Sequence, residues 1–456
     1  MTTDLVSRIQ FAFTVSFHIL FPAMSIGLVT FLTIMEAVWL KTKDPKYKQI
    51  CRFWTKVFAL TFGMGIVSGI VMEFQFGANW AGFTNVVGPA LGALFTYEVL
   101  TAFFIEAGFL GVMLFGWDRV GEKLHFFSTL LVWIGTTLSA FWILSANSWM
   151  QTPDGFMRQA GKLVVTSWYH LILNPSVLPR FTHMLLSAYI TAAFVIAGVS
   201  AHYLLKKKHE VFAKTCFSFS TLSLLVLIVL QIFMGDRVGL EVHKNQPIKT
   251  AAMEAVWNTQ KGAPFLIFAI PDQAKQKNYL EIKIPHGAAL INTHQWNGNL
   301  VGLKSVARKD QPVVPFVFFS FRIMVGLGLL MLIFSIIALY YRRKKRLFNS
   351  PWFLKFSRIM IPAGFIALWC GWVTAEAGRQ PWVVYNILRT KDVASHVPLS
   401  HVIAVFSLII VIYGVIFGYF YFHYLIKVIR TGPEIVKMDA EDQPFQYMSS
   451  GSKEEK

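Results

Sequence analysis

The chain has 456 residues, of which 55% are hydrophobic, 15% are aromatic and only 14% are charged, and its formal net charge is +18 at pH 7. This composition excludes a soluble globular enzyme and predicts a protein that crosses a membrane several times. Cys51, Cys216 and Cys370 show no CxxC spacing, which argues against a disulfide framework and a cysteine-held iron–sulfur cluster. We expect all three to be packing residues.

Nine apolar stretches are long enough to cross about 30 Å of hydrocarbon. They lie at approximately 9–40, 52–80, 88–116, 124–149, 180–205, 212–235, 314–341, 353–378 and 398–428. We therefore expect an all-α fold, a polytopic membrane bundle of about nine transmembrane helices. The head of the chain, MTTDLVSR, has no small-residue cleavage site, so the first helix is expected to be retained.

Basic residues gather in alternate loops between these spans. They follow spans one, five, seven and nine, at Lys41, Lys43, Lys46, Lys48, Arg52, Lys56, Lys206, Lys207, Lys208, Lys214, Arg342, Arg343, Lys344, Lys345, Arg346, Lys427, Arg430 and Lys437. The loop at 81–90 has neither Lys nor Arg. This positive-inside asymmetry predicts an outside N-terminus and a cytoplasmic C-terminus. The positive charge is expected to meet anionic membrane lipid and not nucleic acid.

Polar side chains inside a span are costly and indicate a function or a partner. His18 lies in the first span near its outer side. The third span carries Glu98 and Glu106, eight positions apart, on related faces about 12 Å apart along the axis. Two stacked carboxylates suit a proton relay, and the alternative is pairing with a neighbouring helix or a second subunit. Glu36 and Glu73, nearer to span ends, are explained by snorkelling or interface contacts.

Further candidates follow along the chain. His125 begins the fourth span, and His183 begins the fifth span near the outer side, while Met324 lies at a similar depth in the seventh. A haem iron accepts His, Met or an anionic oxygen as an axial ligand. The alternatives are a hydrogen-bonded core histidine and a packing methionine.

One large polar segment, residues 236–313, interrupts the spans, and its YLEIKIP stretch is typical of a β-strand. A loop of this length is usually functional or disordered, and its scattered Trp, Phe and Ile favour an ordered cap. After the loop, Glu376 ends the eighth span in the motif GWVTAEAGRQPW, with Arg379 close behind it. A buried carboxylate there could ligate a metal centre, and the alternative is a structural ion pair.

With these residues in place, the chain resembles subunit I of the cytochrome bd-type quinol oxidases. The resemblance covers nearly the whole chain and rests on MEFQFGANW (72–80), the carboxylates of span three, FGWDRVG (115–121), SANSWMQTP (145–153), the opening of the external loop, FRIMV (321–325) and GWVTAEAGRQPW (371–382). The passage from KSVARKDQP almost directly into span seven resembles the short-loop branch of this family.

The resemblance implies roles for the candidate residues. His183 and Met324 match the axial pair of a low-spin haem b, and His18 and Glu376 match the ligands of two high-spin haems, with the pairing left open. One high-spin haem is b, and the other is d or a further b. The remaining matches are Arg322 and Arg379 near haem propionates, Trp372 between haems, Glu98 and Glu106 in proton transfer, and Lys249 and Glu254 at the quinol.

The implied function is a terminal oxidase in the cytoplasmic (inner) membrane of a bacterium or archaeon. It would oxidise quinol outside, reduce dioxygen to water and generate a proton-motive force without pumping. Subunit II is the implied heterodimer partner, and a small single-helix third subunit stays open. The implied parts of the chain are helices one to six at 1–235, the quinol-binding loop at 236–313, helices seven to nine at 314–437 and a polar cytoplasmic tail at 438–456.

Two other functions remain as alternatives from the residues alone. One is an ion-coupled secondary transporter, in which the carboxylates would bind the coupling ion. The other is a haem-bearing electron-transfer subunit that does not react with oxygen.

Overall fold

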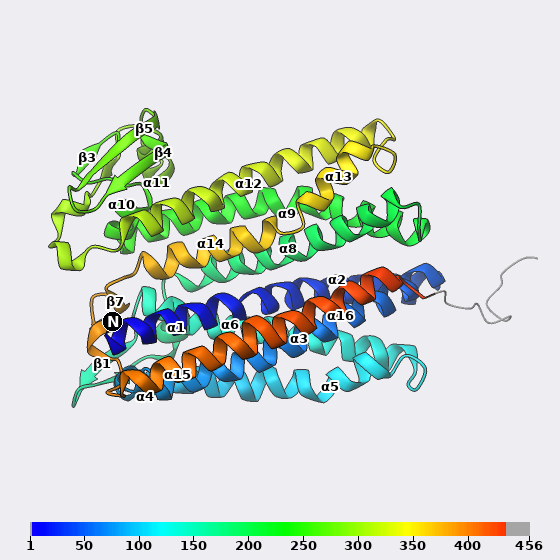
Figure 1. The fold of residues 1–456 in the computed structure, drawn as a ribbon, viewed down its shortest axis with the longest axis horizontal. Helices are drawn as coiled ribbons and strands as arrows, with labels where there is room; N and C mark the ends of the chain where they lie inside the picture. Colours follow the sequence, from blue (N-terminus) through cyan, green and yellow to red (C-terminus); the bar gives the residue numbers. More distant parts are fainter. Residues whose placement is uncertain (1, 435–456) are drawn as a thin grey trace, which may run out of the picture.

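The computed structural model describes residues 2–434, so the predicted tail at 438–456 lies outside the described residues. Within that range, nine helical segments are long and apolar enough to cross a membrane, which confirms the predicted all-α, nine-span fold. Figure 1 shows the helices lying side by side, with the N-terminus at one end of the bundle and the end of the last helix at the other. We call the end that carries the N-terminus and the strands the loop end.

The helices form two groups (Figure 1). The first group consists of α1 (Thr3–His18), α2 (Leu20–Thr42), α3 (Pro45–Ala78), α4 (Ala81–Glu98), the π-helix η1 (Val99–Phe103), α5 (Phe104–Phe115), α6 (Glu122–Gln151), α15 (Leu399–Ile409), the π-helix η5 (Ile410–Phe417) and α16 (Gly418–Thr431). The second group consists of α8 (Val177–Leu205), α9 (Glu210–Asn245), α12 (Val314–Arg343), α13 (Pro351–Ile359) and α14 (Ala363–Ala377).

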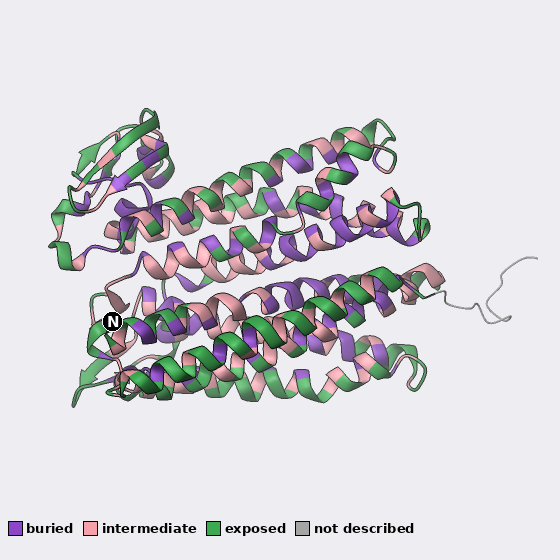
Figure 2. Ribbon diagram, in the orientation of Figure 1, coloured by how far each residue is buried: buried purple, intermediate pink, exposed green. Residues whose placement is uncertain are grey.

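Small residues let helices pack closely, both between the two groups and within the second group. A Cβ placed on Gly27 of α2 would lie 2.5 Å from the carbonyl oxygen of Ala188 on α8, so only glycine permits this approach. A Cβ on Gly364 of α14 would lie 2.7 Å from Cα of Thr191, also on α8. Backbones that approach this closely are typical of helix packing in membranes. Helix α8 is consequently a buried centre of the fold, whereas α15 and α16 are largely exposed (Figure 2).

Two of the predicted spans are interrupted at prolines. Pro22 lacks an N–H group and cannot donate to the carbonyl of His18, and the first span is divided there into α1 and α2. Pro362 separates α13 from α14 in the same way. The first interruption places His18, a predicted ligand, at the last residue of its helix.

The remaining elements gather at the loop end. They are β1 (Phe156–Gln159), β2 (Lys162–Val165), α7 (Trp168–Ile172), α10 (Pro247–Met253), β3 (Gln260–Lys261), β4 (Phe265–Asp272), β5 (Lys277–Ile284), α11 (Gly287–Thr293), β6 (Asn299–Leu300), the 3-10 helices η2 (Leu303–Ser305), η3 (Arg308–Asp310) and η4 (Thr390–Asp392), β7 (Trp382–Val384) and β8 (Leu388–Arg389). Antiparallel pairing joins β1 to β2, β3 to β6, β4 to β5 and β7 to β8.

The loop predicted at 236–313 begins later than expected. Helix α9 continues to Asn245, past the predicted boundary at 235/236, while α12 begins at the expected Val314. Strand β5 confirms the strand predicted in YLEIKIP. The loop packs onto α9 and α12, so it lies over one end of the second helix group.

Candidate functional site

His18 is held in one tautomer by the third helix. Its Nδ1 lies 2.9 Å from Oγ of Ser68 on α3, and that hydroxyl donates to the carbonyl of Met64 at 2.7 Å. Because the hydroxyl proton is already used, Ser68 accepts from the Nδ1–H group. Nε2 therefore carries the free lone pair, which is the arrangement that a metal-ligating histidine needs.

His183 and Met324 lie on two helices that share neighbours. His183 is on α8 and Met324 is on α12, and both helices pack against α9 and α14. Nδ1 of His183 is buried and has no hydrogen-bond partner among the described residues, while its Nε2 lies 3.3 Å from Nε2 of Gln231 on α9. An unpartnered buried polar atom is costly, and it fits a ring whose remaining partner is a bound group.

A glycine faces each of these three side chains. A Cβ on Gly69 would lie 3.1 Å from the His18 ring, a Cβ on Gly235 would lie 3.3 Å from the His183 ring, and a Cβ on Gly371 would lie 3.1 Å from the Met324 sulfur. Each glycine lets its helix backbone lie close to a candidate ligand, where a larger residue would press on the ligand side chain. With a free ring nitrogen on each histidine and a thioether on Met324, the three side chains fit axial ligands of haem irons.

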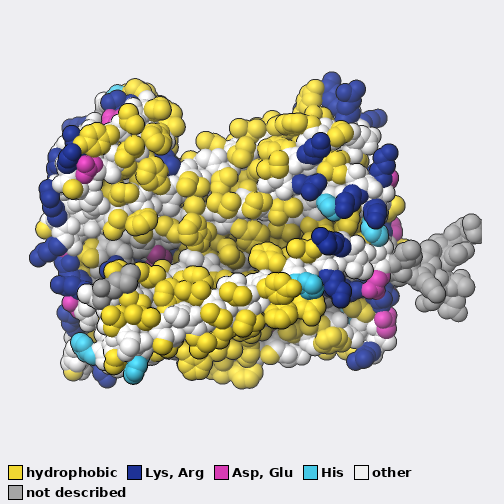
Figure 3. Space-filling view, viewed as in Figure 1, with side chains coloured by type: hydrophobic (Ala, Val, Ile, Leu, Met, Phe, Trp, Pro, Cys, Tyr) yellow, Lys and Arg dark blue, Asp and Glu magenta, His cyan; other side chains and the backbone are white. Residues whose placement is uncertain are grey.

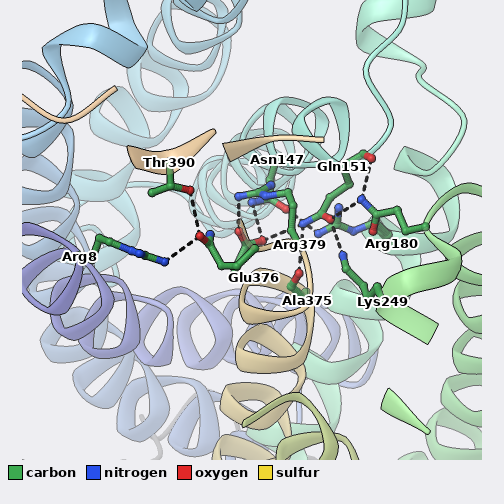
Figure 4. A network of polar contacts seen from close by, with 11 residues as sticks. Arg8, Asn147, Gln151, Arg180, Lys249, Ala375, Glu376, Arg379 and Thr390 are labelled. Carbon is green, nitrogen blue, oxygen red and sulfur yellow. Dashed lines mark hydrogen bonds and ion pairs between the residues drawn. The ribbon is translucent and has the colours of Figure 1, made fainter. Parts of the chain in front are cut away.

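The fourth candidate, Glu376, is oriented by two amides of α6 (Figure 4). Its Oε1 accepts from Asn147 Nδ2 at 3.1 Å and from Gln151 Nε2 at 3.2 Å, and its Oε2 accepts from Arg379. These bonds fix the carboxylate at the end of α14. Outer partners of this kind are what orients a carboxylate ligand.

Cations outnumber carboxylates around Glu376. Arg180 donates to Oδ1 of Asn147 at 2.5 Å, Lys249 donates to Oε1 of Gln151, and Arg379 pairs with Glu376 itself. Nε and Nη1 of Arg379 and Nη1 of Arg180 are buried without a partner among the described residues. Such unused donors suit further carboxylates, and the propionates of a haem are of that kind.

Lys249 lies inside this network and not on the surface of the loop. Burial lowers the pKa of its ammonium group well below the ordinary value, and the neighbouring Arg180 and Arg379 lower this pKa further, against the opposing effect of Glu376. The amide of Gln151 connects it to the Glu376 carboxylate. The structure thus brings Lys249, Arg379 and Glu376 into one network.

Glu254 has different partners. Its side chain is 0% exposed and pairs with Arg322 of α12 at 2.6 Å, while Asn292 of α11 donates to it at 3.1 Å. Arg322 also donates to the carbonyl of Leu266 and keeps Nη1 unpartnered among the described residues. Glu254 lines a cleft in the loop, and Lys249 does not.

Trp372 packs in an apolar cluster with neighbours of two candidate ligands. Its apolar cluster contains Ile19, which follows His18, and Met184, which follows His183. The indole of Trp372 therefore lies in the same apolar cluster as the neighbours of His18 and His183, and its position between haems stays a prediction.

Glu98 and Glu106 both face α6. Ser139 donates to Oε1 of Glu98 at 2.7 Å, and a Cβ on Gly135 would lie 2.6 Å from Cγ of Glu106. Eight residues of regular α-helix would turn the two carboxylates about 80° apart. The wider π turn at Val99–Phe103 lies between them and reduces this rotation.

Glu36 is a further buried carboxylate, and its pairing with another helix was not predicted. Glu36 is 1% exposed, so of the two predicted explanations, snorkelling and interface contacts, snorkelling is wrong. It accepts from Thr129 at 2.7 Å and lies 2.6 Å from Nδ1 of His125, and Trp117 covers that ring at a centroid distance of 4.0 Å. The spacing of His125 and Thr129 on one face of α6 is the only signal in the sequence, and it does not identify Glu36 as their partner.

The protein side chains alone do not assemble a site for a bare metal ion. Among residues 2–434, no group of three or more His, Cys, Asp or Glu side chains comes together. The candidate ligands instead occur singly, with an unpartnered ring nitrogen on His183 and unused donors beside Glu376. This pattern fits haem irons, which take only axial ligands from the protein.

Comparisons with known proteins identify relatives of the chain. A relative from Bacillus subtilis (strain 168), named cytochrome bd ubiquinol oxidase subunit 1, is 38% identical over 412 residues, which cover 87% of this chain and 86% of the relative. A relative from Escherichia coli (strain K12), named cytochrome bd-II ubiquinol oxidase subunit 1, is 33% identical over 475 residues, which cover 89% and 92%.

A solved structure and a family model extend the match. The structure of the bd oxidase from Geobacillus thermodenitrificans superimposes with a TM-score of 0.88 at 26% sequence identity, over 94% of this chain and 99% of that chain. Residues 6–433 match the model of cytochrome bd terminal oxidase subunit I. The chain therefore belongs to the cytochrome bd terminal oxidase subunit I family.

Proposed function

We propose that this protein is the haem-bearing subunit of a terminal oxidase that oxidises quinol and reduces dioxygen to water through three haems. The names of the relatives support quinol as the substrate and an oxidase as the activity. The observation that carries the proposal is the set of buried, unpaired donors around Glu376, together with the glycines that face His18, His183 and Met324.

In this proposal, His183 and Met324 hold a low-spin haem b, and His18 and Glu376 hold the two high-spin haems. One of the high-spin groups is a haem b, and the other is a haem d or a further haem b. When bound, these haems supply electron transfer and the reduction of oxygen. Ser68 keeps Nε2 of His18 free as a ligand, and Asn147 and Gln151 orient Glu376. Arg379 and Arg322 offer donors to propionates, and Trp372 lies between haems.

Quinol is proposed to bind at the external loop, 236–313, where Glu254 lines a cleft together with Trp257 and Leu266. Glu254 accepts a proton from the head group, and Arg322 stabilises the carboxylate. The buried Lys249 contributes through Gln151, which it shares with the Glu376 network. The short passage from this loop into α12 supports the short-loop branch of the family.

Protons for water are proposed to reach the oxygen site through Glu106 and Glu98. Both carboxylates face α6, where Ser139 donates to Glu98. Helices one to six (1–235) and seven to nine (314–437) hold the haem and proton residues, with the N-terminus outside and the C-terminus cytoplasmic. Uptake from one side and release on the other give a proton-motive force without a pump.

We further propose a heterodimer with subunit II in the cytoplasmic membrane of a bacterium or archaeon, and a small third subunit is compatible with it. The test is a purified complex in which haems are counted by pyridine haemochrome and oxygen uptake is measured with quinol. Three haems and quinol-dependent uptake are expected. Absence of stoichiometric haem would favour a transporter, and low-spin haem that ignores carbon monoxide would favour an electron-transfer subunit.

A further inference from the structure

The β4–β5 hairpin of the external loop exposes an unusual amount of apolar surface. The exposed fractions are 72% for Leu280, 58% for Ile282, 50% for Ile267, 50% for Ile284, 44% for Ile270 and 41% for Phe268. The register shifts on both sides of Phe268, so the consecutive residues Ile267 and Phe268 are both exposed. Such bulges redirect side chains, and a contiguous exposed apolar patch marks an interaction surface.

The hairpin lies beside the point where α12 leaves the membrane. Strand β4 packs on α12, and the rings of Phe268 and Phe319 lie 6.4 Å apart. At the opposite end, α12 reaches the aromatic and basic run Tyr340–Arg343, which is typical of a membrane interface. About 20 residues cross the hydrocarbon, which places the second boundary near Ser320. The apolar face of the hairpin therefore continues the lipid-facing surface of α12, where Phe316 and Ile323 are exposed.

The charges on the hairpin fit a lipid headgroup region. Lys275 and Lys277 lie at its tip, over the ring of Tyr279, and Lys283 lies on β5. Figure 3 shows the part of the molecule that contains β3, β4, β5 and α11. Hydrophobic side chains lie on its side that faces along the bundle, and basic side chains lie on its far edge. Apolar side chains that point into a bilayer, with lysines beside them, are characteristic of segments that lie in the membrane interface.

From this geometry we propose that the β4–β5 hairpin docks on the membrane leaflet at the loop end, with Leu280 and Ile282 inserted among the headgroups of anionic phospholipids. Docking of this kind holds the loop against the surface from which lipid-soluble molecules would approach it. The inference does not depend on quinol chemistry, because it concerns only the position of the hairpin relative to lipid.

The test uses the full-length protein, with any subunits that copurify, in nanodiscs that contain anionic phospholipid and a headgroup-level nitroxide lipid. Leu280→Cys and Ile282→Cys are labelled separately with an environment-sensitive fluorophore, and Lys261→Cys on β3 is the matched control in the same loop. The three native cysteines are buried, so labelling is directed to the introduced thiols.

Nitroxide lipid should quench the labels at 280 and 282 and leave the label at 261 unchanged. Replacing the anionic lipid by a zwitterionic one should reduce the quenching. Labels at 280 and 282 that nitroxide lipid does not quench would overturn the proposal. If such unquenched labels were also blue-shifted in the nanodiscs, a protein partner would be the occupant instead.

Discussion

At the scale of single residues, the position of each candidate ligand depends on the glycine that faces it as well as on the chemistry of the ligand side chain. Gly235 lies against the His183 ring, whereas Gly239, one turn further on α9, has no heavy atom within 4 Å of its Cβ position. The two glycines occupy the same helix and differ in what they face. Substituting each of them therefore distinguishes a local packing effect on the His183 ring from a general effect on the helix.

Gly235→Val should displace the His183 ring and reduce the low-spin haem band, because overpacking costs about 1–3 kcal/mol. Gly239→Val should retain the band. Reduced-minus-oxidised spectra per mole of protein measure both. Equal haem content in the two variants would contradict the assignment of His183.

Substitution of Glu376 and of its amide partners should weaken haem binding to different degrees. Glu376→Ala should remove a high-spin haem, since no other side chain in its motif offers an anionic oxygen. Asn147→Ala removes one donor to Oε1 and should weaken binding by roughly 10–100-fold, as outer partners of metal ligands do. Carbon-monoxide difference spectra distinguish the two, and a normal spectrum in Glu376→Ala would refute the role of this carboxylate.

Lys249 predicts a pH-dependent stability. Its folded pKa is lowered, so protonation costs stability at pH values below that pKa, and the cost disappears as the pH rises toward 10.5. Lys249→Met should therefore raise the apparent Tm of the haem-containing protein more near neutral pH than at about pH 10. A Tm difference that does not change with pH would show that the amine is not penalised. Lys261→Met on the exposed strand β3 is the control.

At the scale of elements, the π-helix η1 aligns the two carboxylates of its span. Deleting the exposed Leu100 should convert this segment toward a regular α-helix and turn Glu98 away from Ser139. We expect slower oxygen reduction with all haems present, as for Glu106→Gln, which cannot carry a proton at neutral pH. Oxygen uptake and haem spectra measured together provide the test. Wild-type turnover in both variants would return span three to a structural role.

The elements show which information the sequence contains. The nine spans could be predicted from hydropathy, because a long apolar segment in a membrane has few structures available other than a helix. The interruption at His18 was also readable, since Pro22 lies four residues further on, but it was not predicted. The π turn and the extension of α9 to Asn245 depend on packing against α6 and the loop, and neither has a local sequence signal.

At the scale of the whole molecule, the predicted orientation can be measured directly. The basic loop between α2 and α3 and the external loop lie at opposite ends of the bundle (Figure 1). In intact cells, a membrane-impermeant thiol reagent should label Lys261→Cys and not Lys43→Cys. Both should react after the membrane is opened. The reverse pattern would invert the proposed sides of quinol oxidation and proton uptake.

The site as a whole was predictable only as a set of separate residues. The resemblance assigns Lys249 and Glu254 together to the quinol, but in the structure Lys249 belongs to the Gln151 network and Glu254 pairs with Arg322. It also pairs Glu36 with His125 from a distant helix. Which charges meet across helices is decided by tertiary packing, and hydropathy and motif spacing do not contain it.

The loop at 236–313 has two attachments, the ion pair between Glu254 and Arg322 and the proposed docking of the β4–β5 hairpin on the membrane. These two attachments should depend differently on ionic strength. The carboxylate is fully buried and the arginine nearly so, so mobile ions screen this pair little. The lysines of the β4–β5 hairpin are solvent-exposed, and salt should weaken their attraction to anionic headgroups within a Debye length of about 8 Å. Raising the salt concentration should therefore release the β4–β5 hairpin from the bilayer, while Glu254 stays paired with Arg322 of α12.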